Sequence, residues 1–263
     1  MALTLDLKGK KVLVTGVTSG IGAGVARMFA QAGAMVAGTG RGAADSPGAR
    51  AFESQMELRG TGHVYIAGDV TDASVPRMLA EEAADRLGGI DILVSNAGAN
   101  VFEGAAGCSE ARWQENLELN LGSHWRLAVA CKPYLAQAQQ GVIIIMTSNH
   151  AFETIPGCFP YNVAKTALTG LVRSLAIEWG PSIRAVGLAP GFIDTPGNQR
   201  WFDSFPDAAA ARQQTEALHP VRRIGTAEEI GGWCVFLASR YAGFASGTTY
   251  LVDGGRSAML QDS

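Results

Sequence analysis

Short apolar runs alternate with longer segments of helical period along most of the 263-residue chain. The apolar runs are hydrophobic at consecutive positions, a pattern typical of strands that are buried on both faces. Their regular alternation with helices predicts right-handed crossovers and an α/β fold built on a doubly wound, seven-stranded parallel sheet. The expected strands are Lys11–Thr15, Ala34–Thr39, His63–Ala67, Ile90–Ser95, Val142–Met146, Ile183–Leu188 and Thr248–Val252, and the expected helices cover 20–32, 49–59, 73–87, 109–138, 160–179 and 226–239.

The segment 192–225 departs from this alternation because it is long and rich in proline and aromatic residues, with a helical pattern from about Asp207 to Leu218. An insertion after a late strand lies at the carboxyl edge of a parallel sheet, where ligands bind in such folds. We therefore expect residues 192–225 to form a substrate lid, although a packed surface excursion would fit the same pattern. No repeat or linker divides the chain, so residues 1–263 are predicted to form a single domain.

Charge and composition exclude several kinds of partner. The formal net charge is −3 and no stretch concentrates Lys or Arg, whereas nucleic acids and anionic membranes require a concentrated basic surface. No run approaches the roughly 18 apolar residues of a membrane span, and the N-terminus lacks a signal-peptide pattern, so we expect a cytoplasmic protein. The cysteines have no C-x-x-C spacing, which predicts neither a metal site nor a disulfide framework; they are Cys108, Cys131, Cys158 and Cys234.

A glycine-rich turn follows the first expected strand directly and leads into a helix. Glycines permit a tight turn and a close approach of the backbone to a pyrophosphate, and the helix N-terminus offers free N–H groups to the anion. This position in a β–α–β unit predicts a Rossmann-type dinucleotide-binding fold. The candidate cofactor-binding residues of the turn are Gly16, Thr18, Ser19, Gly20, Ile21 and Gly22.

The end of the second strand bears on the choice between NAD and NADP. It reads Gly-Thr-Gly-Arg41 and lacks the carboxylate that would bind the ribose 2′-hydroxyl of NAD, whereas Arg41 suits the 2′-phosphate of NADP. The pattern therefore favours NADP; alternatively Arg41 is a solvated loop residue and either cofactor fits. Asp69 and Val70 end the third strand, where Asp69 is placed to reach the adenine amino group, and Asn96-Ala97-Gly98 end the fourth, beside the adenosine ribose.

Acid–base chemistry is indicated by Tyr161 and Lys165, four residues apart on an expected helix, with Ser148 at the end of the fifth strand. Residues spaced i, i+4 share one helix face. Tyrosine has a reference pKa of about 10, and a nearby ammonium together with the positive charge of an oxidised nicotinamide favours its phenolate. We therefore expect Tyr161 to act as a general acid–base group, with Ser148 hydrogen-bonded to the substrate oxygen.

These motifs resemble the short-chain dehydrogenase/reductase family along essentially the whole chain. The resemblance implies that Tyr161 is the catalytic acid–base residue, that Lys165 lowers its pKa and holds the nicotinamide ribose, and that Ser148 orients the substrate. It further implies that Asn120 supports a water linked to Lys165, and that the protein is a homotetramer, as members of the family usually are, or a dimer, as they sometimes are. Further matches are Pro190-Gly191 and Asp253-Gly254-Gly255, with Ile193 and Thr195 at the positions that contact the carboxamide. The sequence departs from the family pattern at three positions. Ser95 replaces a usual asparagine, Ala164 replaces a frequent serine, and Val186 stands where an asparagine is often found.

The residues expected to line the substrate pocket include several that form hydrogen bonds, which suits a hydroxylated substrate. His150 and Ile155-Pro156 are similar to the corresponding stretch of bacterial glucose 1-dehydrogenases. We therefore interpret the protein as a sugar dehydrogenase that oxidises the anomeric carbon to a lactone, with His150 either touching the substrate or packing behind it. The candidate substrate-binding residues are Asn100, Ser148, His150, Tyr161, Phe192, Arg200 and Trp201, with Asn149 and Glu153 close by.

Three arginines, Arg200, Arg222 and Arg223, raise the further possibility of an anionic sugar such as a sugar acid or sulfosugar, unless they simply face solvent. Two other functions fit the same motifs: an NADPH-dependent ketone or β-ketoacyl reductase, and a non-catalytic NAD(P)-binding regulator. The complete set Asn120, Ser148, Tyr161 and Lys165 argues against the regulator, because a sensor requires none of it.

Overall fold

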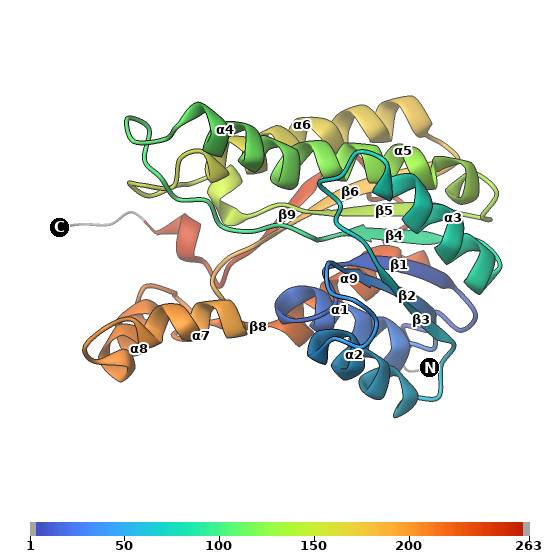
Figure 1. The fold of residues 1–263 in the computed structure, drawn as a ribbon, viewed down its shortest axis with the longest axis horizontal. Helices are drawn as coiled ribbons and strands as arrows, with labels where there is room; N and C mark the ends of the chain where they lie inside the picture. Colours follow the sequence, from blue (N-terminus) through green and yellow to red (C-terminus); the bar gives the residue numbers. More distant parts are fainter. Residues whose placement is uncertain (1–3, 260–263) are drawn as a thin grey trace.

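The computed structural model describes residues 4–259, and a seven-stranded parallel sheet forms their centre (Figure 1). Its strand order, β3-β2-β1-β4-β5-β6-β9, reverses direction between β1 and β4, as in a doubly wound fold. The predicted Rossmann-type architecture is thus confirmed. The strands are β1 (Lys11–Thr15), β2 (Met35–Gly40), β3 (His63–Ala67), β4 (Ile92–Ser95), β5 (Gly141–Met146), β6 (Ile183–Pro190) and β9 (Thr249–Val252).

Two layers of helices cover the sheet (Figure 1). One face carries α1 (Gly20–Gln31), α2 (Pro47–Glu57) and α9 (Ala227–Ala238), and the other carries α3 (Val75–Leu87), α4 (Glu110–Leu117), α5 (Ser123–Leu135) and α6 (Tyr161–Trp179). All residues of β5 and β6 are buried, which explains why the central strands are apolar at consecutive positions.

Helices α1 and α9 pack at unusually short range. A Cβ on Gly24 would lie 2.6 Å from Ala227, and one on Gly231 would lie 2.7 Å from Met28, so only glycine fits at both positions. The contact joins the helix after the glycine-rich turn to the helix that follows the 192–225 segment. These two parts of the site therefore rest on one rigid support.

The expected helix 109–138 is present over residues 110–135, but it is not α-helical throughout. A π-helical turn, Glu118–Gly122, separates α4 from α5. The side chain of Asn120 in this turn exchanges two hydrogen bonds with the backbone of Ala99, at 2.9 and 3.2 Å. Such turns widen the helix locally and often occur at functional sites; here the turn directs Asn120 toward the end of β4.

Residues 192–225 form a projection beyond the carboxyl edge of the sheet (Figure 1). Two short parallel strands, β7 (Ile193–Asp194) and β8 (Gly225–Thr226), close its base, and it holds α7 (Pro196–Asp203) and α8 (Ala208–Ala217). The predicted helix near 207–218 corresponds to α8, whereas α7 was not expected. A small core of Phe202, Ala211 and Ile224 stabilises the projection. Across the described residues, no helix is both long and apolar enough to cross a membrane.

Candidate active site

The glycine-rich turn has the backbone geometry of an anion cradle. Gly16 and Gly20 have φ angles of 76° and 57°, in the region that favours glycine. A Cβ on Gly22 would lie 2.1 Å from the Gly16 carbonyl oxygen. Ser19 makes no side-chain capping bond, so the first amides of α1 remain available to a ligand phosphate. These observations fit a dinucleotide pyrophosphate.

The end of β4 is fastened to this turn. Both the Asn96 and the Ala97 amides donate to Thr15 Oγ1 at 2.9 Å, and the Asn96 side chain donates to the Thr15 carbonyl at 2.9 Å. A Cβ on Gly98 would lie 2.8 Å from Asn120 Oδ1, so the chain has no room for a side chain there. The structure thus brings the predicted residues 16–22 and 96–98 together.

The adenosine end is less enclosed. Asp69 Oδ1 accepts hydrogen bonds from the Thr71 amide and hydroxyl at 3.0 and 2.8 Å, and Val70 is buried beside it. Arg41 is exposed at the end of β2 and forms no ion pair within residues 4–259. Its guanidinium is therefore available to a ribose 2′-phosphate.

Tyr161 and Lys165 lie in the first two turns of α6, as the spacing predicted, and both are buried. The Lys165 ammonium donates to the Met146 carbonyl at 3.1 Å and lies 5.5 Å from the centre of the Tyr161 ring. Ser148 follows β5; its hydroxyl accepts from the His150 amide at 3.2 Å and lies close enough to Tyr161 to lower the pKa of that phenol. The three expected acid–base residues are thus assembled at the carboxyl edge of the sheet.

The pKa values of the pair differ from the sequence-based expectation. Burial raises the pKa of Tyr161 to about 12; the hydrogen bond from Ser148 lowers it and the neighbouring Cys158 raises it further. Burial lowers the pKa of Lys165 to about 7. In the protein alone, desolvation is the dominant effect on both groups and favours their neutral forms. The positive charge of an oxidised nicotinamide is then the further contribution that a phenolate requires.

Asn120 is fully buried and its amide is satisfied within the chain. Besides its bonds to Ala99, it donates to Asn116 Oδ1 at 3.0 Å, and Asn116 in turn donates to the Pro160 carbonyl just before Tyr161. Asn116 was missed by sequence reasoning, although its i, i+4 spacing from Asn120 was a usable signal. The implied water between Asn120 and Lys165 stays a prediction.

Ser95, the departure from the family pattern, has a specific partner. Its hydroxyl forms a 2.7 Å hydrogen bond with His124 Nδ1, and His124 is buried. Burial lowers the pKa of His124 well below its ordinary value, and the charge of Lys165 lowers it further. His124 is therefore a neutral imidazole behind Lys165. The sequence contained a signal for this residue, because a histidine four residues after Asn120 lies on the same helix face.

His150 lies beside the reacting group. It belongs to the short 3₁₀ turn Asn149–Ala151, and its ring centre is 6.2 Å from that of Tyr161 and 6.1 Å from that of Phe102. Burial lowers the pKa of His150, and the positive charge of Arg256 adds to this effect. Phe102 and Arg256 were not among the expected pocket residues.

Thr195 faces the glycine-rich turn, since a Cβ on Gly20 would lie 3.4 Å from its methyl group. The backbone amide of Gly191 donates to Val252, which ties the Pro190-Gly191 step to β9, and Ile193 is buried nearby. The predicted carboxamide-contact residues therefore lie on the same side of the cleft as the cofactor turn.

The other candidates in the 192–225 segment divide into two groups. The rings of Phe192 and Trp201 are 5.6 Å apart within an aromatic cluster, whereas Arg200 is exposed. Arg223 forms a bidentate ion pair with Glu229 at 2.6 and 2.8 Å, and Arg222 donates to the Ala217 carbonyl. Arg222 and Arg223 therefore support the base of the projection, which argues against their proposed contact with an anionic sugar. Asn100 and Glu153 are exposed, and Asn149 is half-buried.

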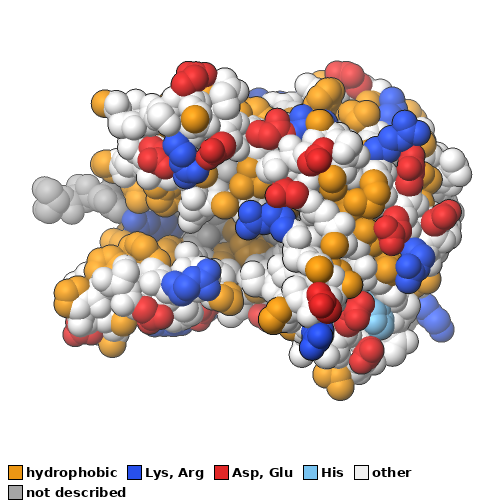
Figure 2. All heavy atoms as spheres, viewed as in Figure 1, with side chains coloured by type: hydrophobic (Ala, Val, Ile, Leu, Met, Phe, Trp, Pro, Cys, Tyr) orange, Lys and Arg blue, Asp and Glu red, His pale blue; other side chains and the backbone are white. Residues whose placement is uncertain are grey.

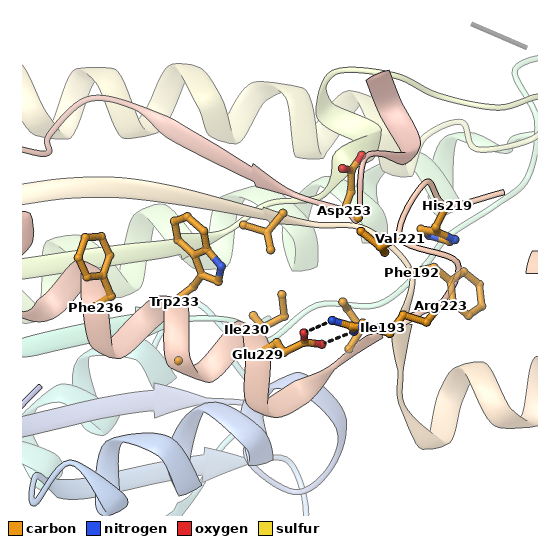
Figure 3. Close-up of a pocket in the computed structure, with 14 residues that line it drawn as sticks. Phe192, Ile193, His219, Val221, Arg223, Glu229, Ile230, Trp233, Phe236 and Asp253 are labelled. Atoms are coloured by element: carbon orange, nitrogen blue, oxygen red, sulfur yellow. Dashed lines mark hydrogen bonds and ion pairs between the residues drawn. The ribbon is translucent and has the colours of Figure 1, made fainter. Parts of the chain in front are cut away.

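A cavity of about 420 Å³ lies between the projection, α9 and the end of β9 (Figure 3). Phe192, Val221, Trp233 and Asp253 line it together with the Arg223–Glu229 pair. Neither Ser148 nor Tyr161 nor Lys165 contributes to it, so it is not the space in which the reaction would occur. An open cleft lies between the projection and the rest of the molecule (Figure 2).

Comparison with known proteins defines the class. A family model described as enoyl-(acyl carrier protein) reductase matches residues 16–257. The human dehydrogenase/reductase SDR family member 4 is 37% identical over 257 residues, which cover 97% of this chain and 90% of that protein. The chain therefore belongs to the short-chain dehydrogenase/reductase family, and it is a nicotinamide-dependent oxidoreductase acting on CH–OH groups.

Other relatives differ in the substrates for which they are named. An L-fucose dehydrogenase of Oryctolagus cuniculus is 36% identical over 257 residues, covering 97% of this chain and 87% of the relative. A 3β-hydroxysteroid dehydrogenase of Eggerthella lenta is 35% identical over 252 residues, covering 95% and 94%. The ligand-free aldohexose dehydrogenase of Thermoplasma acidophilum has a TM-score of 0.89 at 27% identity, covering 99% of each chain.

Proposed function

We propose that this protein is a sugar dehydrogenase that oxidises the anomeric carbon of an aldose to a lactone. The observation that carries the proposal is the position of His150, whose ring centre is 6.2 Å from that of Tyr161 and which adds a hydrogen-bonding group next to the reacting position. Hydrogen-bonding groups suit a polyhydroxylated substrate better than an apolar one. The similarity to relatives named for L-fucose and for an aldohexose supports the same substrate class.

The proposed chemistry assigns one role to each buried polar group. Ser148 orients the anomeric hydroxyl, and Tyr161 as phenolate accepts its proton. Lys165, in the next turn of α6, holds the nicotinamide ribose, while Asn120 and Asn116 fix the backbone on which it and Tyr161 depend. When it is bound, the nicotinamide of the cofactor accepts the hydride. In the reverse direction Tyr161 protonates a carbonyl oxygen.

The cofactor is proposed to be NADP rather than NAD, with its 2′-phosphate bound by Arg41. The support is the exposed Arg41 at the end of β2 and the absence of a carboxylate at this strand end. Replacement of Arg41 by Ala should lower kcat/KM for NADP by about tenfold, the value of one charge-assisted contact, and leave NAD unaffected. Equal loss with both cofactors would contradict this assignment.

We also propose that residues 192–225 close over the substrate as a lid and that the protein is a cytoplasmic homotetramer. Large apolar side chains lie exposed near the edge strand β9 and on α5, which supports self-association: Trp125, Val129, Trp233, Phe236 and Leu251 are each at least a third exposed. Light scattering of the purified protein measures the assembly directly.

The function is tested by following absorbance of the reduced nicotinamide with NAD or NADP and a panel of aldoses. Reduction of the cofactor by one group of sugars supports the proposal. Oxidation of NADPH by ketones or β-ketoacyl compounds, without reaction of any sugar, would instead establish the reductase. Cofactor binding with no turnover of any carbinol or carbonyl would favour the regulator.

A further inference from the structure

The turn after β9 places a cation at the mouth of the cleft. The Asp253 carboxylate accepts hydrogen bonds from the Gly255 amide at 3.0 Å and the Ser257 amide at 2.8 Å, which fixes the turn. A Cβ on Gly255 would lie 2.9 Å from Pro220, so the turn packs closely against the base of the projection. Arg256 is the first residue of the 3₁₀ turn that follows (Arg256–Ala258).

Arg256 has unsatisfied binding capacity. Its side chain is half-buried, and the buried Nη1 has no hydrogen-bond partner among the described residues. Burial lowers the pKa of Arg256 and the charge of the nearby Asp253 raises it, but both oxygens of that carboxylate accept hydrogen bonds from backbone amides. Arginine cannot lose its proton in a protein, and a buried charged donor without an acceptor is costly. A ligand anion would provide the missing acceptor.

The position of Arg256 relative to the reacting group follows from His150. The charge of Arg256 reaches His150, and the His150 ring stands edge-on to that of Tyr161 at 6.2 Å. Basic side chains lie deep in the cleft in Figure 2. The guanidinium is thus close enough to His150 for its charge to lower the pKa of that imidazole, and His150 packs against the proposed acid–base group.

The arginines of the projection are less suited to this task. Arg223 is paired with Glu229, and Arg212 is paired with both Asp194 and Glu216. Arg200 is exposed on the last turn of α7 and has no buried donor. Of the arginines considered, Arg256 alone combines a buried free donor with proximity to His150.

We propose that Arg256 determines specificity by binding a carboxylate, sulfonate or phosphate group of the substrate, at the end remote from the hydroxyl that is oxidised. A guanidinium binds such groups through two parallel hydrogen bonds. The inference rests on the proposed function, since it names the class of sugar that the site oxidises: an anionic aldose rather than a neutral one.

The test compares D-glucose with D-glucuronate, glucose 6-phosphate and 6-deoxy-6-sulfoglucose, so that the three anionic groups are distinguished. We expect wild-type kcat/KM to favour one anionic sugar. In Arg256→Met the KM for that sugar should rise about 10- to 100-fold, the value of a hydrogen bond between charged groups. Its kcat and the rate with glucose should remain similar. Arg256→Lys should restore part of the affinity, and Arg173→Met, an exposed residue of α6, is the matched control.

Binding is measured separately from turnover, by calorimetric titration of the same sugars into protein saturated with NADPH. Binding of an anionic sugar that Arg256→Met loses and Arg256→Lys partly keeps supports the inference even if no sugar is oxidised, which would defeat only the proposed function. Turnover of neutral sugars with no preference for any anionic one would overturn the inference and leave the dehydrogenase intact. An equal loss in the Arg173→Met control would also overturn it.

Discussion

The carboxyl edge of the sheet and the 192–225 projection meet at the same cleft but are built differently. At the sheet edge, Tyr161, Lys165 and Asn120 are buried. Lys165 and Asn120 donate to the backbone carbonyls of Met146 and Ala99, and Asn116 donates to the carbonyl that precedes Tyr161. The projection has two-residue strands and a core of three buried side chains. Local stability depends on buried apolar contacts. The difference indicates that the residues proposed for the chemistry are held rigidly, while the projection is less firmly fixed and can move and vary.

The largest effect is expected where the rigid side performs the chemistry. Tyr161→Phe removes the proton acceptor while keeping the ring, so kcat should fall by about 10²- to 10⁴-fold. The affinity for the cofactor should be nearly unchanged, as measured by quenching of protein fluorescence on titration with NADPH. Turnover within tenfold of wild type would show that another group moves the proton.

Two phenylalanines of similar burial, one in each region, allow the stability of the two regions to be tested separately. Phe29 on α1 belongs to the main core, and Phe202 belongs to the projection. Phe29→Ala should lower the free energy of global unfolding by about 3–5 kcal/mol. Phe202→Ala should instead raise hydrogen exchange within residues 192–225 and raise KM, with little change in the exchange of β5 and β6. Similar exchange patterns in both variants would mean that the projection unfolds together with the sheet.

A pH profile tests how Tyr161 is tuned. The hydrogen bond from Ser148 lowers the pKa of Tyr161 against the dominant effect of burial. Oxidation requires the phenolate, so its rate should increase with pH, and Ser148→Ala should move this increase to higher pH. The loss of one hydrogen bond to a charged group predicts a fall in kcat/KM of about 10- to 100-fold at neutral pH. An unshifted profile with a lower plateau would restrict Ser148 to orienting the substrate.

The smallest effect concerns Glu229, where the projection joins α9. The ion pair with Arg223 is the main cause that lowers the pKa of Glu229 to about 2, and hydrogen bonds from Thr226 contribute. Because the pKa is lowered on folding, the stabilisation is present above the ordinary pKa of 4.5 and is lost as the pH falls toward 2.

The Glu229 side chain is 42% exposed, so Glu229→Gln should cost only about 1 kcal/mol at pH 7. The difference in unfolding free energy from wild type should shrink between pH 4.5 and 2. Glu81→Gln, which breaks an exposed pair within α3, is the control, and a difference that stays constant with pH would contradict the assignment.

The elements that the sequence predicted well are those encoded locally. Consecutive apolar residues specify buried strands, and the i, i+4 spacing of Tyr161 and Lys165 places both on one helix face. Helix α7 was missed because Pro196 and Gly197 suggest a turn, although Thr195 before a proline is also a common helix start. The local pattern admits both readings, and only packing of Phe202 in the small core decides between them.

The unpredicted parts of the site depend on contacts between distant segments. The pair of Ser95 and His124 joins residues 29 positions apart, and Arg256 reaches His150 from the far end of the chain. A contact between residues far apart in the sequence produces no hydrophobic period or short spacing from which it could be predicted. For the same reason desolvation of Tyr161 could not be anticipated: spacing indicates that Lys165 is a neighbour but gives no measure of burial.

The close contact between α1 and α9 has a consequence for how such an enzyme can be altered. Because Gly24 and Gly231 leave no room for added atoms, insertions or bulky replacements near residues 224–231 would displace the cofactor helix as well. Sequence change is better tolerated at the exposed positions between Trp201 and Leu218, away from the small core that holds Phe202 and Ala211. A library randomised in that stretch should yield altered substrate preference at an unchanged cofactor KM, whereas one centred on α9 should yield mostly inactive protein.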